Sequence, residues 1–125
     1  MKWVSTESVI EIHKMVIDST GGSQGVRSLG ALESALNSPL ATFNGTDLYP
    51  DIVDKAATLL NSITNNHPFI DGNKRTTFVV IATILEDNGY KTQFTQEEVV
   101  SFMLQIAQGN LNQSEIKQWL EKHFL

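Results

Sequence analysis

Six segments of this chain place their apolar residues three and four positions apart, which is the spacing of one face of an α-helix. They cover about 6–19, 29–37, 50–66, 73–88, 96–108 and 112–124. Because all the long patterns are helical, we expect an all-α fold, a compact bundle of about six helices. The third helix begins at Pro50 or Asp51. The 73–88 segment is apolar almost all round, so it is expected to be the most buried helix.

Residues 40–49 have no helical period, and they contain an Asn-Gly pair that favours a short β-hairpin, or flap. We expect Phe43, Leu48 and Tyr49 to tether this flap to the core. Its exposed backbone would either hold an extended peptide by strand addition or form a plain surface loop. The residues alone favour neither.

Composition and charge limit the classes of function. The chain has 125 residues, which suits one domain spanning 1–125. The net charge of −5 argues against direct binding to nucleic acid, which needs a basic face. The absence of cysteine excludes a disulfide framework and a thiolate metal site. The N-terminal residues lack the apolar core of a signal peptide, and the longest apolar run is too short for a bilayer. We therefore expect a cytoplasmic protein that does not enter a membrane.

The stretch from His67 to Arg75, HPFIDGNKR, is unusual for a connector between two helices. Pro68 ends the preceding helix, because a residue before proline is pushed out of the α region. Lys74 and Arg75 then fall in the first turn of the next helix, where the helix dipole makes each cation cost about 0.3–1 kcal/mol. Free N–H groups and two cations at one helix N-terminus indicate an anion site, and phosphate is the obvious anion.

His67 and Asp71 add chemistry that phosphate binding alone does not need. A histidine removes a proton near neutral pH, and a carboxylate beside bound phosphate holds Mg²⁺. A base, a carboxylate and a phosphate site in one short stretch predict the transfer of a group from a nucleotide.

Two side chains outside this stretch have more than one interpretation. Arg27 follows a glycine-rich loop. It is either an exposed loop residue, which the spacing alone favours, or a phosphate ligand that folds toward the His67 stretch. His13 lies near the apolar stripe of the first helix, and a structural role is favoured over a ligand role.

The same stretch resembles the signature of the Fic/Doc superfamily, HxFx(D/E)GN(G/K)R, and the lysine at position 74 matches the Doc (death on curing) branch. The similarity continues in segments 21–27, 32–36, 43–50 and 55–57, and covers about residues 5–90. The resemblance implies a Fic/Doc-like helical bundle. It also implies a toxin of a type II toxin–antitoxin pair, which a cognate, Phd-like antitoxin neutralises.

The resemblance further implies roles for individual residues. It implies that Phe69 faces the core and fixes the loop. By position in the motif these roles are general base for His67, Mg²⁺ ligand for Asp71, anion hole for Gly72 and Asn73, and binding of the ATP phosphates for Lys74 and Arg75.

The implied reaction is transfer of the γ-phosphate of ATP to a threonine of elongation factor Tu, which halts translation. Fic relatives transfer AMP instead. Two differences from their pattern favour phosphate transfer here, because Lys74 stands where they have glycine and Phe78 where they have a further arginine. AMP transfer by the same loop and a catalytically silent regulatory or interaction domain are the alternatives.

Overall fold

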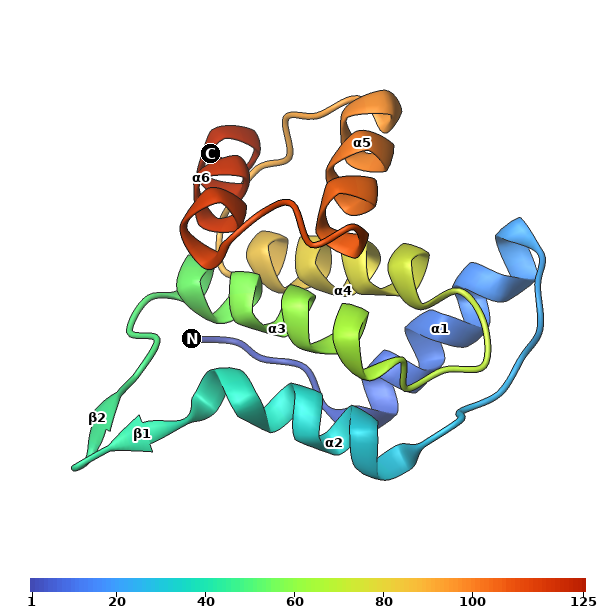
Figure 1. Ribbon diagram of the computed structural model, residues 1–125, viewed down its shortest axis with the longest axis horizontal. Helices are drawn as coiled ribbons and strands as arrows, with labels where there is room; N and C mark the ends of the chain where they lie inside the picture. The colour runs from blue at the N-terminus through green and yellow to red at the C-terminus, as the bar shows by residue number, and fades with distance from the viewer.

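The computed structural model describes all 125 residues, and Figure 1 shows a bundle of six α-helices. In chain order the elements are α1 (Thr6–Thr20), α2 (Leu29–Asn37), a 3₁₀ helix (Ser38–Leu40), β1 (Thr42–Phe43), β2 (Thr46–Asp47), α3 (Ile52–Asn66), α4 (Asn73–Asp87), α5 (Gln96–Ala107) and α6 (Gln113–His123). The all-α fold with six helices and a short hairpin is thereby confirmed. All six helices fall short of the length and apolar content that crossing a bilayer requires.

Five of the helices begin with a side-chain cap that satisfies one backbone N–H in the first turn. The capping residues are Ser5, Ser28, Asp51, Thr95 and Asn112. Because Asp51 caps α3, the helix proper begins at Ile52 and Pro50 lies before it. The exception is α4, whose N-cap is Gly72 and which no side chain caps.

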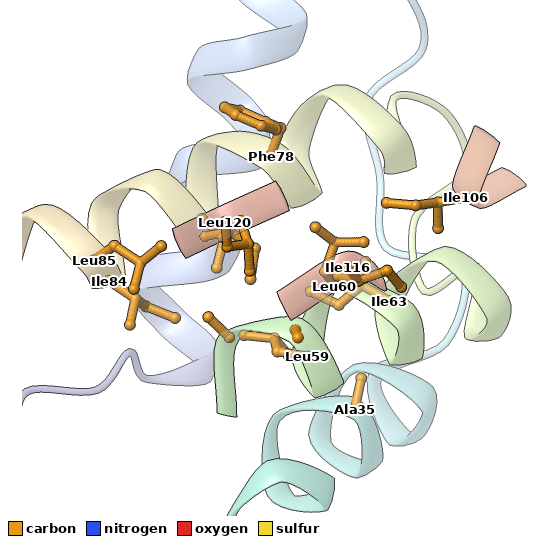
Figure 2. Packing of buried hydrophobic residues seen from close by; sticks show 14 of the residues in the cluster. Ala35, Leu59, Leu60, Ile63, Phe78, Ile84, Leu85, Ile106, Ile116 and Leu120 are labelled. Atoms are coloured by element: carbon orange, nitrogen blue, oxygen red, sulfur yellow. The ribbon is translucent and has the colours of Figure 1, made fainter. Parts of the chain in front are cut away.

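The most enclosed helix is α3, so the expectation that the 73–88 segment would be the most buried was wrong. α3 packs against α2, α4, α5 and α6 and lies in the middle of the bundle in Figure 1. Nine residues of α3 are buried, compared with seven residues of α4, and Val79 of α4 is 41% exposed. Figure 2 shows Leu59, Leu60 and Ile63 of α3 among side chains of the neighbouring helices. The sequence underrated α3 because much of its buried surface is alanine, threonine and one lysine.

The two loops that flank α3 lie at opposite ends of this helix (Figure 1). The β1–β2 hairpin precedes its N-terminus, and the His67 stretch follows its C-terminus. A helix of 15 residues at about 1.5 Å per residue separates the two by roughly 22 Å. The segment that lies beside the His67 stretch is instead the α1–α2 connection, where Val26 forms an antiparallel bridge with Phe69.

The expected apolar tether of the hairpin is wrong. Phe43 and Leu48 are 69% and 54% exposed, and Tyr49 is only partly buried. The hairpin is instead held by Lys55 of α3, a buried lysine whose Nζ donates to the Asp47 carboxylate at 3.1 Å and to the Tyr49 carbonyl. A hairpin this short has too few inward-facing positions for an apolar anchor, so a long side chain from the helix supplies the contact.

Candidate active site

α3 ends at Asn66, and the next residue, the C-cap His67, has a left-handed backbone with φ 46° and ψ 59°. The His67 N–H donates to the Ile63 carbonyl at 3.2 Å and closes the last turn. Glycine is the usual residue in this conformation, and another residue there costs about 1 kcal/mol or more. The imidazole is exposed, and no other group of the protein hydrogen-bonds to it. A strained residue with a free ring nitrogen is typical of a functional position.

Phe69 anchors the loop that follows His67. Its side chain is fully buried, as expected, and its ring stacks on the His13 ring with centroids 4.0 Å apart. The Asn73 side chain holds the Phe69 backbone from the other direction, because its Oδ1 accepts from the Phe69 N–H at 3.0 Å and its Nδ2 donates to the Phe69 carbonyl at 2.9 Å. The side-chain amide of Asn73 is thus engaged by the loop, which leaves its backbone N–H for an anion.

His13 of α1 is a structural residue, as the sequence favoured. It is buried, and its Nε2–H donates to the backbone carbonyl of Asp71 at 2.8 Å. A carbonyl oxygen only accepts hydrogen bonds, so this contact places a proton on Nε2. The bond ties the middle of the loop to α1.

Arg27 is exposed, as the spacing favoured, but its side chain is bound to the end of α3. Its Nε donates to the His67 carbonyl at 2.7 Å, and its Nη2 donates to the Asn66 carbonyl at 2.8 Å. A cation that binds the last carbonyls of a helix stabilises its C-terminus. Arg27 therefore positions the loop, and its predicted contact with phosphate stays a prediction.

The N-terminus of α4 is open toward solvent. Gly72 has a left-handed φ of 75°, and a Cβ added there would lie 2.7 Å from Cδ1 of Ile17, so both conformation and space require glycine. Because no side chain caps α4, the first N–H groups of this helix face outward without a protein acceptor. Lys74 and Arg75 stand in this first turn.

The two cations differ in their contacts. Arg75 donates from Nη1 to the Thr20 hydroxyl and to the Gly21 carbonyl at 2.9 Å, and its Nη2 lies 3.7 Å from Oδ1 of Asp71. Lys74 is exposed and forms no ion pair. The cations are not drawn into separate salt bridges, and both line the same pocket.

The Asp71 carboxylate is held by backbone groups from two sides. The Ser23 N–H donates to its Oδ2 at 3.1 Å, and the Gly72 N–H donates to its Oδ1 at 2.8 Å. These bonds, the Ser23 bond first, lower the pKa of Asp71 below its usual value, with a smaller contribution from Arg75. A Cβ on Gly22 would lie 2.5 Å from Oδ2, so the carboxylate sits against a glycine backbone. Asp71 is therefore ionised at neutral pH.

One ionised carboxylate beside an anion site suits Mg²⁺, which binds through one or two carboxylates together with substrate phosphates and water. The protein contains no cluster of three side chains that would hold a metal without such a substrate. The donor set fits a magnesium ion that arrives with a nucleotide.

These groups surround one open pocket of about 340 Å³. Its lining residues are Thr64, His67, Ile70, Asp71, Gly72, Asn73, Lys74 and Arg75. The pocket therefore combines a free imidazole, a carboxylate, two cations and an uncapped helix N-terminus.

Comparison with known proteins agrees with this geometry. Residues 3–85 match the model of the Fic/DOC family. The chain belongs to the Fic/DOC family. It is 40% identical over 89 residues to Toxin Doc of Mycolicibacterium smegmatis, which is 70% of this chain and 68% of that protein. It is 26% identical over 122 residues to Protein kinase doc of Escherichia phage P1, which is 98% of this chain and 95% of that protein.

The Fic/DOC match spans the pocket but not the whole bundle. It begins just before α1 and ends within α4, so it contains every residue that lines the pocket. Helices α5 and α6 lie outside it. The family-model match therefore covers the part of the fold that builds the site, whereas the similarity to Protein kinase doc extends over 98% of the chain.

The structure brings together most of the residues predicted for the Fic/DOC site. Those that line the pocket are His67, Asp71, Gly72, Asn73, Lys74 and Arg75. Arg27 does not line it. Sequence reasoning missed Thr20 and Ser23, which bind the side chains of Arg75 and Asp71 from the α1–α2 region. It also missed Thr64, whose only sequence signal is its place three residues before His67.

Proposed function

We propose that this chain is a Doc-type toxin that uses ATP to phosphorylate a serine or threonine hydroxyl of a translation protein, elongation factor Tu by its resemblance to the Doc branch. The observation that carries the proposal is the convergence of a free imidazole, an ionised carboxylate and an uncapped, doubly cationic helix N-terminus on one pocket. The names of the two relatives, Toxin Doc and Protein kinase doc, support the toxin and kinase parts.

The N-terminus of α4 is the proposed binding site for the triphosphate. Backbone N–H groups there point outward, and the helix dipole favours negative charge. The cost of two cations in the first turn is offset when phosphate oxygens bind between them. Lys74 is free to bind at once, whereas Arg75 exchanges part of its contact with Asp71 for the nucleotide.

The proposed transfer begins at the target hydroxyl, with His67 as general base. The hydroxyl proton moves to a ring nitrogen of His67 while the hydroxyl oxygen bonds to the γ-phosphorus. The bond from that phosphorus to the β,γ-bridging oxygen breaks, and ADP leaves with the electron pair. The protein contributes mainly position and charge stabilisation, as in other phosphoryl transfers.

Asp71 is the proposed ligand of Mg²⁺. When bound, the metal would neutralise charge on the phosphates. The backbone bonds from Ser23 and Gly72 keep the Asp71 carboxylate charged and oriented, so the protein supplies a fixed negative group beside the cations.

Two residues favour phosphate transfer over AMP transfer. Lys74 adds bulk and charge in the first turn of α4, where glycine would let a phosphate approach the backbone closely. Phe78 is buried against Phe94, with ring centroids 5.1 Å apart, so it supplies no phosphate contact one turn further along. A nucleotide that lies differently from that of an AMP transferase presents its γ-phosphate to the hydroxyl.

ATP labelled separately at the α and γ positions tests the reaction. The purified protein, Mg²⁺ and elongation factor Tu are incubated with each label, and the target is analysed by mass spectrometry. We expect label from the γ position only. Label from the α position would indicate AMP transfer, and no label on any protein of a translation extract would indicate a silent domain.

The pair of variants Lys74→Gly and Lys74→Ala separates charge from backbone access. Both remove the cation, so both should slow phosphate transfer by weakening phosphate binding. Only Lys74→Gly opens the backbone, and it alone should give AMP transfer. Phosphate transfer at the wild-type rate in both variants would contradict a role for Lys74.

A toxin of this kind acts in the cytoplasm and requires a partner. We propose a cognate, Phd-like antitoxin that neutralises the chain by direct binding. Growth arrest on expression of the chain, relieved when the adjacent small reading frame is co-expressed, is the expected result. Growth arrest that no adjacent reading frame relieves would contradict it.

A further inference from the structure

Thr64 carries a buried hydroxyl without a hydrogen-bond partner in the wall of the candidate site. It lies on the last turn of α3, lines the pocket and is only 5% exposed. Its Oγ1 has no partner in the protein. Burying a hydroxyl in this way costs about 1–3 kcal/mol, so such a group in a native fold needs an explanation.

Other helical threonines of the chain show what Thr64 does not do. Four of them donate their hydroxyl to the carbonyl four residues earlier, namely Thr20, Thr58, Thr77 and Thr83. Thr64 makes no such bond to the Leu60 carbonyl. Thr76 is also without a partner, but it does not line the pocket. Thr64 is thus the one pocket-lining residue with a buried hydroxyl that has no partner.

His67 is the natural partner of this hydroxyl. It lies three residues later at the end of the same helix, lines the same pocket, and its ring makes no hydrogen bond. A general base needs a group that holds its second ring nitrogen, since that bond decides which nitrogen carries the proton. Asn73 and Asp71 are engaged by backbone groups, and the cations of the pocket only donate.

We propose that Thr64 Oγ1 accepts a hydrogen bond from Nδ1–H of His67. The exposed imidazole rotates to make this bond, which fixes the tautomer and leaves Nε2 as the unprotonated nitrogen. Nε2 then takes the proton of the target hydroxyl while Nδ1 keeps its own. Thr64 touches neither the nucleotide nor the target, so it is a positioning residue. Its effect on turnover rests on the proposed function, whereas the hydrogen bond itself does not.

Nitrogen-15 NMR of His67 in the free, full-length protein tests the bond directly. Wild type should show a proton on Nδ1, and Thr64→Ser, which keeps the hydroxyl, should show the same. Thr64→Val removes the hydroxyl at constant shape and should shift His67 to a mixture of tautomers. Thr58→Val is the matched control, because it removes a buried hydroxyl of the same helix that bonds to the Asp54 carbonyl. It should leave the His67 tautomer unchanged.

Kinetics separate positioning from binding. Thr64→Val should lower kcat about 10–100-fold, the usual effect of removing a group that orients a reactive side chain, with an unchanged KM for ATP. Thr64→Ser should retain most of the wild-type kcat. A proton on Nε2 of His67 in wild type, or a tautomer that Thr64→Val does not change, would overturn the proposal even if the kinase reaction is found. A tautomer that depends on Thr64 without any phosphate transfer would support the bond and contradict the proposed function.

Discussion

The two loops at the ends of α3 are held in different ways. The loop between α3 and α4 is bound by His13, Ser23 and Arg27, which lie 39 to 58 positions away in the chain. The β1–β2 hairpin is bound by Lys55, which lies six and eight positions from its two acceptors. One loop is tied to the bundle by distant segments, and the other only to the helix that follows it.

This difference indicates which loop the fold holds in a fixed position. Contacts between distant segments form only when the whole bundle is folded, so the position of the α3–α4 loop depends on the folded bundle. A site that must hold a base and a phosphate within fractions of an ångström needs such support. The hairpin, which exposes Phe43 and Leu48, needs only enough contact to remain closed.

Removing the base should give the largest effect. We expect His67→Ala to reduce phosphate transfer about 10²–10⁴-fold without unfolding the protein, because the proposed proton acceptor is lost. The matched change in the other loop is Asn44→Ala. Asn44, with φ 52°, and His67 are the two non-glycine residues with a positive φ. Asn44→Ala should retain wild-type transfer in the γ-label assay. Near wild-type transfer by His67→Ala would show that another group is the base.

Removing the clamp on Phe69 should give the next largest effect. Asn73→Ala deletes both hydrogen bonds to the Phe69 backbone and leaves two buried backbone groups unpaired. We expect unfolding free energy to fall by about 1–3 kcal/mol and transfer to fall about 10–100-fold. Asn65→Ala is the control, because Asn65 is exposed and bonds only to Asn61. Stability is measured by urea unfolding and transfer by the γ-label assay. If Asn73→Ala and Asn65→Ala had equal stability and equal transfer, the clamp would not order the site.

The equivalent change at the hairpin should affect stability alone. Lys55→Met keeps the buried length of the side chain but removes the donor for the Tyr49 carbonyl. We expect a loss of about 1–3 kcal/mol in urea unfolding and unchanged phosphate transfer under conditions where the variant is folded. Loss of transfer to a protein target, with the fold intact, would show that the hairpin takes part in docking and that the two loops share one task.

Acid should affect the α3–α4 loop through Asp71, and this is the smallest effect. The pKa of Asp71 is lowered in the folded protein, so its stabilisation is full above the unfolded pKa of about 3.9 and is lost as pH falls through the folded value. The Ser23 and Gly72 amides should then shift in an NMR titration below about pH 4. The shift should be absent in Asp71→Asn, and a shift that persists in that variant would assign the titration to another group.

Local signals made the helices predictable, and long-range contacts explain what was missed. Ser5, Ser28 and Thr95 act as caps within one turn, so their positions in the sequence are enough to place helix ends. The task of Arg27 depends on carbonyls 39 and 40 residues away, which no local pattern reveals. Lys55 misled the hairpin prediction because a buried lysine looks the same in a sequence as an exposed one.

The site itself was predictable because its groups are contiguous. Six of the predicted site residues, all lining the pocket, stand within His67–Arg75, where helix-end chemistry and the family motif coincide. The motif does not specify which of these residues support the loop and which remain free to bind a ligand. Asn73 binds Phe69 with its side chain, and only the folded structure separates such supporting contacts from groups left free for a ligand.

The left-handed backbone of His67 implies a conflict between activity and robustness. A glycine at this position would relieve the strain and terminate α3 at least as well, yet it would remove the imidazole. A single replacement of His67 by glycine would therefore remove the proposed base while relieving the backbone strain. The His67→Gly protein should therefore be well folded while lacking the proposed base.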